Sequence, residues 1–167
     1  EYTRKFYHPA DRQWEELIAN DMGRVKALSS WKAKIRQDWS DLEIREVQTR
    51  TLDGETFTEF GDQQSELSVG SEVQVQAQIH LGRLEPQDVA VQVYFGHVDS
   101  SGRIKDGQIA EMTYEQDTLD PQRVASFSGT IPCRISGRHG YALRILPQHE
   151  DLIESYEPGL ILWESGR

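Results

Sequence analysis

The stretch "SEVQVQAQIHL", residues 71–81, decides the fold. Every second residue from Val73 to Leu81 is apolar, and the residues between them are glutamines and one histidine. Successive side chains of a β-strand point to opposite faces, so a period of two gathers the apolar residues on one face. This stretch therefore predicts a strand that buries one face and exposes the other.

The same alternation recurs in "DVAVQVYFG", residues 88–96, where Val91, Val93 and Phe95 share one face. We expect further strands at residues 42–49, 107–115, 123–133, 141–146 and 159–164. Roughly seven short strands with frequent turn signals are typical of an antiparallel immunoglobulin-like β-sandwich, so the expected fold class is mainly β. Tyr141 begins one strand, where such sandwiches often place a tyrosine whose hydroxyl bonds back to the preceding corner.

An α-helical segment precedes the predicted sandwich, at residues 10–39. Its apolar residues recur at spacings of three and four, on one side of a helix: Trp14, Leu17, Ile18, Met22, Val25, Leu28, Trp31, Ile35 and Trp39. Asp21 and Gly23 interrupt the pattern, which predicts either two helices or one kinked helix. An amphipathic helix is not stable alone, so this one must pack on a partner surface. We divide the chain into a helical connecting segment, residues 1–41, and a C-terminal β-sandwich domain, residues 42–167.

Composition argues against several classes of protein. No apolar run approaches the ~20 residues that a membrane-spanning helix needs. The single cysteine, Cys133, leaves no partner for an internal disulfide or a cysteine zinc site, and we expect a reducing, cytoplasmic setting. Residues 43–167 carry 10 basic and 21 acidic side chains, a balance that repels nucleic-acid backbones. Because the sequence begins with Glu1 rather than methionine, we expect a piece of a longer protein.

Residues with catalytic or metal-binding chemistry are present but do not form a known pattern. The five histidines do not fall at a metal-ligand spacing: His8, His80, His97, His139 and His149. The stretch "DSSGRIKDG", residues 99–107, has Arg103 where a calcium loop needs an oxygen ligand, so a hairpin turn is favoured. Glu150 and Asp151 lack a second carboxylate that the sequence would place opposite them. We therefore predict no catalytic, cofactor-binding or metal-binding residue in this chain.

Sugar binding needs only exposed aromatic rings and a few polar groups. Tyr94 points outward if Phe95 points inward, and Tyr114 lies outside the certain core. Both are candidate contacts to a glucan or to another protein surface, although loop or interface packing is the more common role for each. Trp163, on the last predicted strand, is a candidate core residue or interface anchor, and we favour the core.

Several stretches resemble one family. "SGRHGYALRILPQHEDL" and "YEPGLILWE" resemble the end of α-glucan phosphorylases, and more narrowly the branch that carries an extra β-sandwich after the catalytic region. "EYTRKFYHPA" and "WKAKIRQDW" are similar to the segment that leads into that sandwich. "VAVQVYFGHVDSSGRI" and "FSGTIPCRISGRHGY" extend the likeness, so it covers most of the chain in the expected order.

The resemblance implies a pyridoxal-phosphate-dependent parent enzyme that uses phosphate to release glucose 1-phosphate from a terminal α-1,4-linked glucose. It also implies that the cofactor lysine, the phosphate-binding groups and the glucan cleft lie upstream, in a catalytic region that would be this chain's partner. The sandwich would then be non-catalytic, and it would hold glucan, mediate contacts in a homo-oligomer or cover an apolar surface. The alternative is a free-standing carbohydrate-binding or protein-interaction sandwich; a small hydrolase is a third, remote reading.

Overall fold

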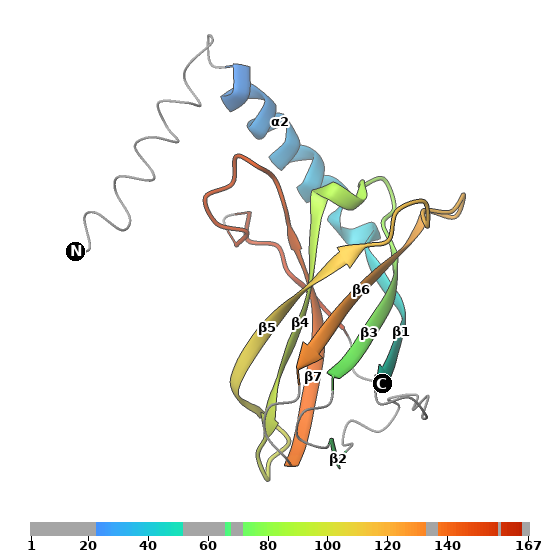
Figure 1. The fold of residues 1–167 in the computed structure, drawn as a ribbon. Coiled ribbons are helices and arrows are strands. Elements are labelled where there is room, and N and C mark those ends of the chain that lie inside the picture. Colours follow the sequence, from blue (N-terminus) through green and yellow to red (C-terminus); the bar gives the residue numbers. More distant parts are fainter. Residues whose placement is uncertain (1–22, 52–65, 68–71, 133–136, 157, 165–167) are drawn as a thin grey trace, which may run out of the picture.

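The computed structural model describes residues 23–51, 66–67, 72–132, 137–156 and 158–164 (Figure 1). The helical elements are the α-helix α2 (Gly23–Asp38) and two 3-10 turns, η2 (Trp39–Asp41) and η3 (Pro86–Asp88). The strands are β1 (Glu43–Thr51), β2 (Glu66–Leu67), β3 (Glu72–His80), β4 (Val89–Val98), β5 (Ile104–Tyr114), β6 (Val124–Pro132), β7 (Gly137–Pro147) and β8 (Leu162–Trp163).

The strands form one antiparallel sheet that curls back on itself at β5. Its order is β1-β3-β6-β5-β4-β7-β2, and β8 pairs with the free side of β7's C-terminal half. β5 pairs with β4 over most of its length and reaches β6 only at Thr113 and Tyr114. β1, β3 and β6 form one half of the sheet, and β4, β7 and β8 form the other. This pairing is that of an immunoglobulin-like sandwich and confirms the predicted fold class.

The core lies between the two halves of the curled sheet. In β3 the buried residues alternate with polar ones as predicted, from Val73 to Ile79. Val91, Val93 and Phe95 of β4 are buried on the opposing half and join the same hydrophobic cluster. Each fully buried side chain of this size contributes roughly 1.5–3 kcal/mol relative to an exposed one. The alternation in the sequence thus records which side of each strand faces the core.

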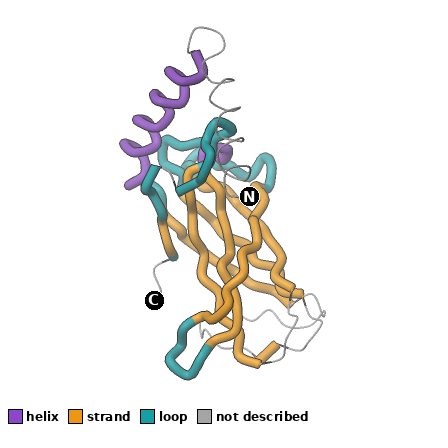
Figure 2. The backbone as a smooth tube through the Cα atoms, turned by 90° about the vertical axis from the view of Figure 1, so that its left-hand side faces the viewer, coloured by secondary structure: helices purple, strands orange, loops and turns teal. Residues whose placement is uncertain are grey.

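Helix α2 packs at one end of the sandwich, as Figures 1 and 2 show. Leu28 and Ile35 are buried, and Trp31 between them is half-buried. Ile35 belongs to the same hydrophobic cluster as the strands, so the helix finds the partner surface that its apolar side required. The predicted helical residues 10–22 lie outside the described residues, and the division into two domains at residue 41 stays a prediction.

Some local predictions can be compared with the structure only in part. Between β1 and β3, where no strand is predicted, the structure has the two-residue strand β2, which pairs with Gly137 and Arg138 of β7. Tyr141 lies opposite Phe95 and packs against the core cluster. The corner before it includes residues 133–136, Cys133 among them, which lie outside the described residues. The predicted hydrogen bond from the Tyr141 hydroxyl to that corner therefore stays a prediction.

Candidate functional site

One outer surface of the sandwich carries a group of aromatic side chains around an arginine, and we call Tyr94, Arg144, Tyr156 and Trp163 the aromatic face. Strand register builds it. Gln92 of β4 lies opposite Arg144 of β7, and Arg144 lies opposite Trp163 of β8. Directly opposed residues of antiparallel strands share a face, so these side chains form one row on the outside of the sheet.

Arg144 fixes the centre of the aromatic face. Its Nε donates to Gln92 Oε1 at 2.7 Å, and Gln92 Nε2 donates to Glu111 Oε1 at 2.6 Å. Its guanidinium carbon lies 5.6 Å from the centre of the Trp163 ring and 5.9 Å from that of Tyr156. Both distances fall within the range of cation–π attraction. One buried arginine therefore orients two aromatic rings.

Tyr94 extends the aromatic face along β4. Its ring meets Trp163 edge to face, with 6.2 Å between the ring centres. A Cβ atom on Gly107 would lie only 2.1 Å from Cζ of Tyr94, so the ring occupies space that every other residue would fill. A bulge in β5, in which Asp106 has φ 49°, brings Gly107 to this position. Phe95 is buried, so the predicted outward direction of Tyr94 is confirmed.

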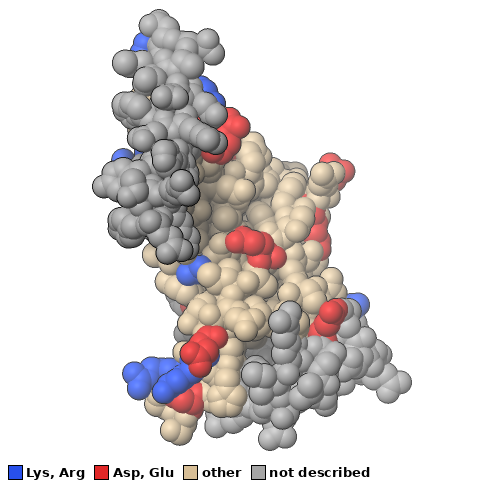
Figure 3. All heavy atoms as spheres, turned by 60° about the vertical axis from the view of Figure 1, so that its left-hand side comes forward, with Lys and Arg blue, Asp and Glu red and all other residues tan. Residues whose placement is uncertain are grey.

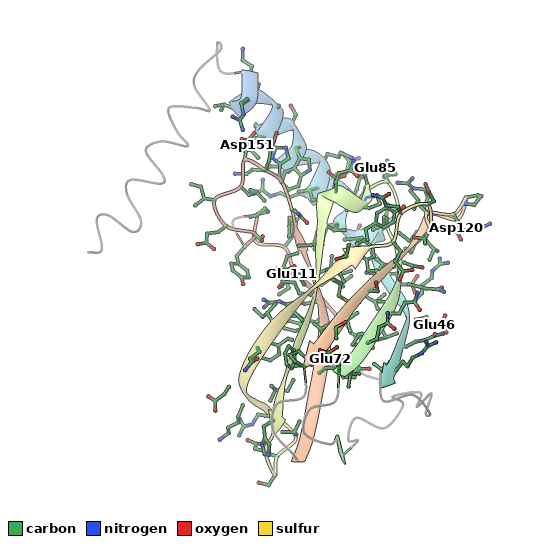
Figure 4. The ribbon with its side chains drawn as sticks, viewed as in Figure 1. Glu46, Glu72, Glu85, Glu111, Asp120 and Asp151 are labelled. Atoms are coloured by element: carbon green, nitrogen blue, oxygen red, sulfur yellow. The ribbon has the colours of Figure 1, made fainter. Side chains whose placement is uncertain are left out.

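The exposed large apolar side chains of the described residues lie on β5, on β8 or in the segment between β7 and β8. They are Ile109, Ile153, Tyr156, Ile161 and Trp163. The outer surface of β1, β3 and β6 is polar instead, with Gln74, Gln76 and Gln78 along β3. Figure 3 brings the β5 side forward, and its middle carries few charged side chains. Figure 4 labels Glu111 of β5. The glutamines outside β3 and the aromatic side chains outside β4, β7 and β8 give the two outer surfaces a different chemistry.

The structure separates the other aromatic candidates. Tyr114 lies at the end of β5, where its half-buried ring packs on Phe127 with 5.6 Å between centres. It is thus part of the rim of the core, apart from Tyr94. The expectation that Trp163 fills the core is wrong: its side chain is 41% exposed, because its register partner Arg144 points outward. Tyr156, which carries the other ring on Arg144, was missed from the sequence.

A second cluster fastens α2 to the sandwich, and we call Trp31, Lys34 and Asp88 the helix anchor. Asp88 Oδ1 accepts a hydrogen bond from Trp31 Nε1 at 2.8 Å. Its Oδ2 accepts from Lys34 Nζ at 3.1 Å and from the backbone N–H of Glu85 at 2.9 Å. Burial would raise the pKa of the Asp88 carboxyl, but the bonds from Glu85, Trp31 and Lys34 outweigh it, so the pKa is lowered.

The acidic loop after β7 also serves the helix. Asp151 is buried and forms an ion pair with Arg24 of α2, and its backbone N–H donates to His149 Nδ1 at 3.1 Å. The His149 ring lies 4.8 Å from that of Trp31. Figure 4 shows Asp151 beside the helix. These groups resemble a catalytic constellation in the sequence, yet their contacts hold two elements together.

The remaining polar candidates also have local partners. Asp99 Oδ1 accepts from the backbone N–H groups of Ser101 and Arg103 and from the Ser101 hydroxyl, which makes the predicted hairpin turn. His80 Nδ1 lies 3.0 Å from the backbone oxygen of Asp41. Among the described residues, no group of three or more His, Cys, Asp or Glu side chains could hold a metal ion. The one α-helix described, α2, is too short and too polar to cross a membrane.

Comparisons with known proteins agree with the resemblance noted in the sequence. The model of the glycogen phosphorylase C-terminal domain family matches residues 39–165. The chain is 27% identical over 161 residues to a glycogen phosphorylase of Mycobacterium bovis and 26% identical over 161 residues to one of Mycobacterium tuberculosis. Each match covers 96% of this chain.

A maltodextrin phosphorylase of Thermococcus litoralis is 25% identical over 170 residues, which cover 98% of this chain. The matched region is 17% of the length of each of these three relatives. No solved structure matches the chain significantly. Because the family model covers most of its residues, from the end of α2 to β8, the chain belongs to the glycogen phosphorylase C-terminal domain family.

Proposed function

We propose that this chain is the non-catalytic C-terminal domain of a cytoplasmic α-glucan phosphorylase, and that the catalytic region of the same polypeptide is its partner. That enzyme would transfer a terminal α-1,4-linked glucose from glucan to phosphate and release glucose 1-phosphate. The observation that carries the proposal is the family match over residues 39–165, in relatives of which this chain spans 17% of the length. These relatives are a glycogen phosphorylase and a maltodextrin phosphorylase.

The use of the acidic side chains supports a non-catalytic role. General acid–base catalysis needs a carboxyl or imidazole group that is free to exchange a proton with a substrate. Asp88 instead accepts three hydrogen bonds, and Asp151 is buried against Arg24. Both groups hold the helix on the sandwich, which supports a structural role for these two carboxylates.

The resemblance implies that the parent enzyme uses pyridoxal phosphate as its cofactor. Its aldehyde requires a lysine enclosed by the protein. The described lysines do not fit this requirement: Lys34 is 42% exposed and paired with Asp88, and Lys105 is 66% exposed on a hairpin beside Asp99. Lys26 and Lys32 lie on α2 as well. We therefore assign the cofactor to the catalytic region.

The aromatic face favours the second candidate, a free-standing sandwich that binds a carbohydrate or another protein. Exposed aromatic and apolar side chains grouped on one surface are a feature of binding sites in general. The two candidates differ in the size of the native protein, since a free-standing sandwich needs no catalytic region.

The size of the native polypeptide tests the proposal. An antibody raised to this chain should detect in source-cell extract a band several times heavier than 19.2 kDa, with the purified chain as the mass standard on the same gel. The heavy species, once purified, should convert maltodextrin and phosphate to glucose 1-phosphate. A native band at 19.2 kDa would reject the proposal in favour of the free-standing sandwich.

A further inference from the structure

We propose that the aromatic face is a binding site for α-glucan, in which sugar rings stack on Trp163 and Tyr156. This inference rests on the proposed function, which brings a glucan polymer to the polypeptide. It assigns a second contact with glucan, on the outer surface of β4, β5, β7 and β8, to a domain without catalytic chemistry. Tyr94 would support the stacking ring of Trp163 from the side.

The chemistry of the face suits a sugar. A pyranose ring presents apolar C–H groups on its faces and hydroxyl groups around its edge, so it needs flat aromatic surfaces with a few polar groups beside them. Trp163 and Tyr156 supply the flat surfaces, at 41% and 54% exposure. The same row runs from Trp163 through Arg144 and the buried Gln92 to the exposed carboxylate of Glu111 on β5, at the far edge of the face. Apolar walls with a few placed polar groups are the usual composition of such sites.

The rings are held in place before any ligand arrives. Arg144 contacts both rings at 5.6 and 5.9 Å, and its own position is fixed by the 2.7 Å hydrogen bond to Gln92. A ring that is already ordered loses little conformational entropy when a ligand stacks on it. A binding site built on strands also keeps its geometry better than one built on loops. Trp163 lies on a strand, whereas Tyr156 lies in the loop before β8 and is ordered by its contact with Arg144.

The size of the exposed surface favours a narrow ligand over a protein. Full burial of an aromatic side chain removes about 150–250 Å² of its surface from water. Since Tyr156 is 54% exposed and Trp163 is 41% exposed, the two side chains together leave about 200 Å² for a ligand to cover. A specific protein interface buries about 800 Å² on each partner. Ile109 and Ile161 enlarge the surface only to the roughly 300–600 Å² that a typical monomer exposes.

Charge gives the same preference. The hydroxyl groups of a sugar donate readily to a carboxylate such as Glu111, at the β5 edge of the face. A glucan is uncharged, so the net charge of −10 does not oppose its approach. A phosphate-rich polymer would be repelled by the same charge.

The test is a titration of the full 167-residue chain with maltoheptaose. Binding is measured during the titration by calorimetry and by tryptophan fluorescence. We expect saturable binding with a Kd of about 1 mM, as befits two stacked rings. Trp163→Ala should weaken binding about tenfold or more, and Tyr156→Ala several-fold, since each removes one stacking surface. Trp163→Phe keeps a ring and should retain most of the affinity. Gln76→Ala, on the polar outer surface, is the matched control and should change nothing.

Circular dichroism and urea midpoints would verify that each variant is folded. An absence of saturation at tens of millimolar maltoheptaose would overturn the inference. So would a result in which Trp163→Ala and Tyr156→Ala both bind maltoheptaose as tightly as the wild-type chain. A chain that self-associates in sedimentation, becomes monomeric on Trp163→Ala and ignores maltoheptaose would identify a protein interface instead, which also overturns it.

The outcome is separable from that of the proposed function. A 19.2 kDa native protein that binds maltoheptaose through Trp163 rejects the proposed function and leaves the glucan site standing. A heavy native phosphorylase whose domain does not bind maltoheptaose supports the proposed function and rejects the site.

Discussion

Asp88→Ala should lower the free energy of unfolding by about 3 kcal/mol, because it removes the acceptor of three hydrogen bonds in the helix anchor. The bond from Trp31 to a charged, largely buried acceptor contributes about 1.5 kcal/mol. The bond from the Glu85 backbone caps a 3-10 turn and contributes about 1 kcal/mol. The ion pair with Lys34, whose side chain is 42% exposed, adds at most about 0.5 kcal/mol. The melting temperature should fall by about 6–12 °C.

Urea unfolding of the full chain, followed by circular dichroism, measures this change. Lys34→Ala removes only the exposed partner and is the matched control, with an expected loss of at most about 0.5 kcal/mol. Trp31→Phe keeps an aromatic ring beside His149 but removes the indole N–H, and should cost about 1–2 kcal/mol. If Asp88→Ala cost no more than Lys34→Ala, the hydrogen bonds to Asp88 would not hold the helix, and the reasoning from them would be refuted.

The pKa of Asp88 adds a pH signature to the same experiment. Since its pKa in the folded chain lies below the ordinary 3.8, the charged form stabilises the fold at every pH above that ordinary value. This stabilisation is lost as the pH falls below about 4 and through the folded pKa. The difference between wild type and Asp88→Ala should therefore stay constant from neutral pH down to about 5 and shrink below about 4. A difference that grows in acid would contradict the assignment.

Three further outcomes follow from other contacts. Gly107→Ala should force the Tyr94 ring outward at a cost of about 1 kcal/mol, seen as a lower urea midpoint and a lost ring contact by NMR. Arg144→Met should cost about 2 kcal/mol in urea unfolding, because Gln92 loses a charged donor and two rings lose their cation. Burial, aided by Glu164, raises the pKa of Tyr141 from 10.0 to about 12, so ultraviolet titration should find it protonated until about pH 12. Its contribution to stability is present below pH 10.0 and is lost as the pH rises to about 12.

The strands that border the core could be predicted because their side chains alternate regularly. In β3 each residue from Val73 to Ile79 takes the face that its parity predicts. β5 breaks this rule, since the bulge at Asp106 and Gly107 shifts the register. The parity of Tyr114 therefore cannot be counted from the start of β5, and its packing on Phe127 could not be inferred from the sequence.

The candidate site was predictable only where it lay on a regular strand. Tyr94 could be placed outward because Phe95 beside it had to point inward. Trp163 lies on a strand of two residues, which is too short to show alternation, so its face depends on pairing with Arg144. Tyr156 lies on no strand at all, and its place over Arg144 is set by the path of the loop.

The helix anchor marks a different limit. Trp31 and Asp88 are 57 positions apart, and no local period connects them. The sequence showed only that the helix needed a partner, which any apolar surface would satisfy. What selects the partner is the carboxylate of Asp88, which is held by the turn that begins β4.

The contrast between the two outer surfaces carries the functional argument. A sandwich needs one apolar face on each half, and the other face can be polar throughout. β3 follows this rule, with Gln74, Gln76 and Gln78 on its outside. The half that carries the aromatic face departs from it by placing exposed rings where folding requires none, and by committing a buried arginine to hold them. Departures from the pattern that folding needs are expected at functional sites, and the aromatic face is such a departure.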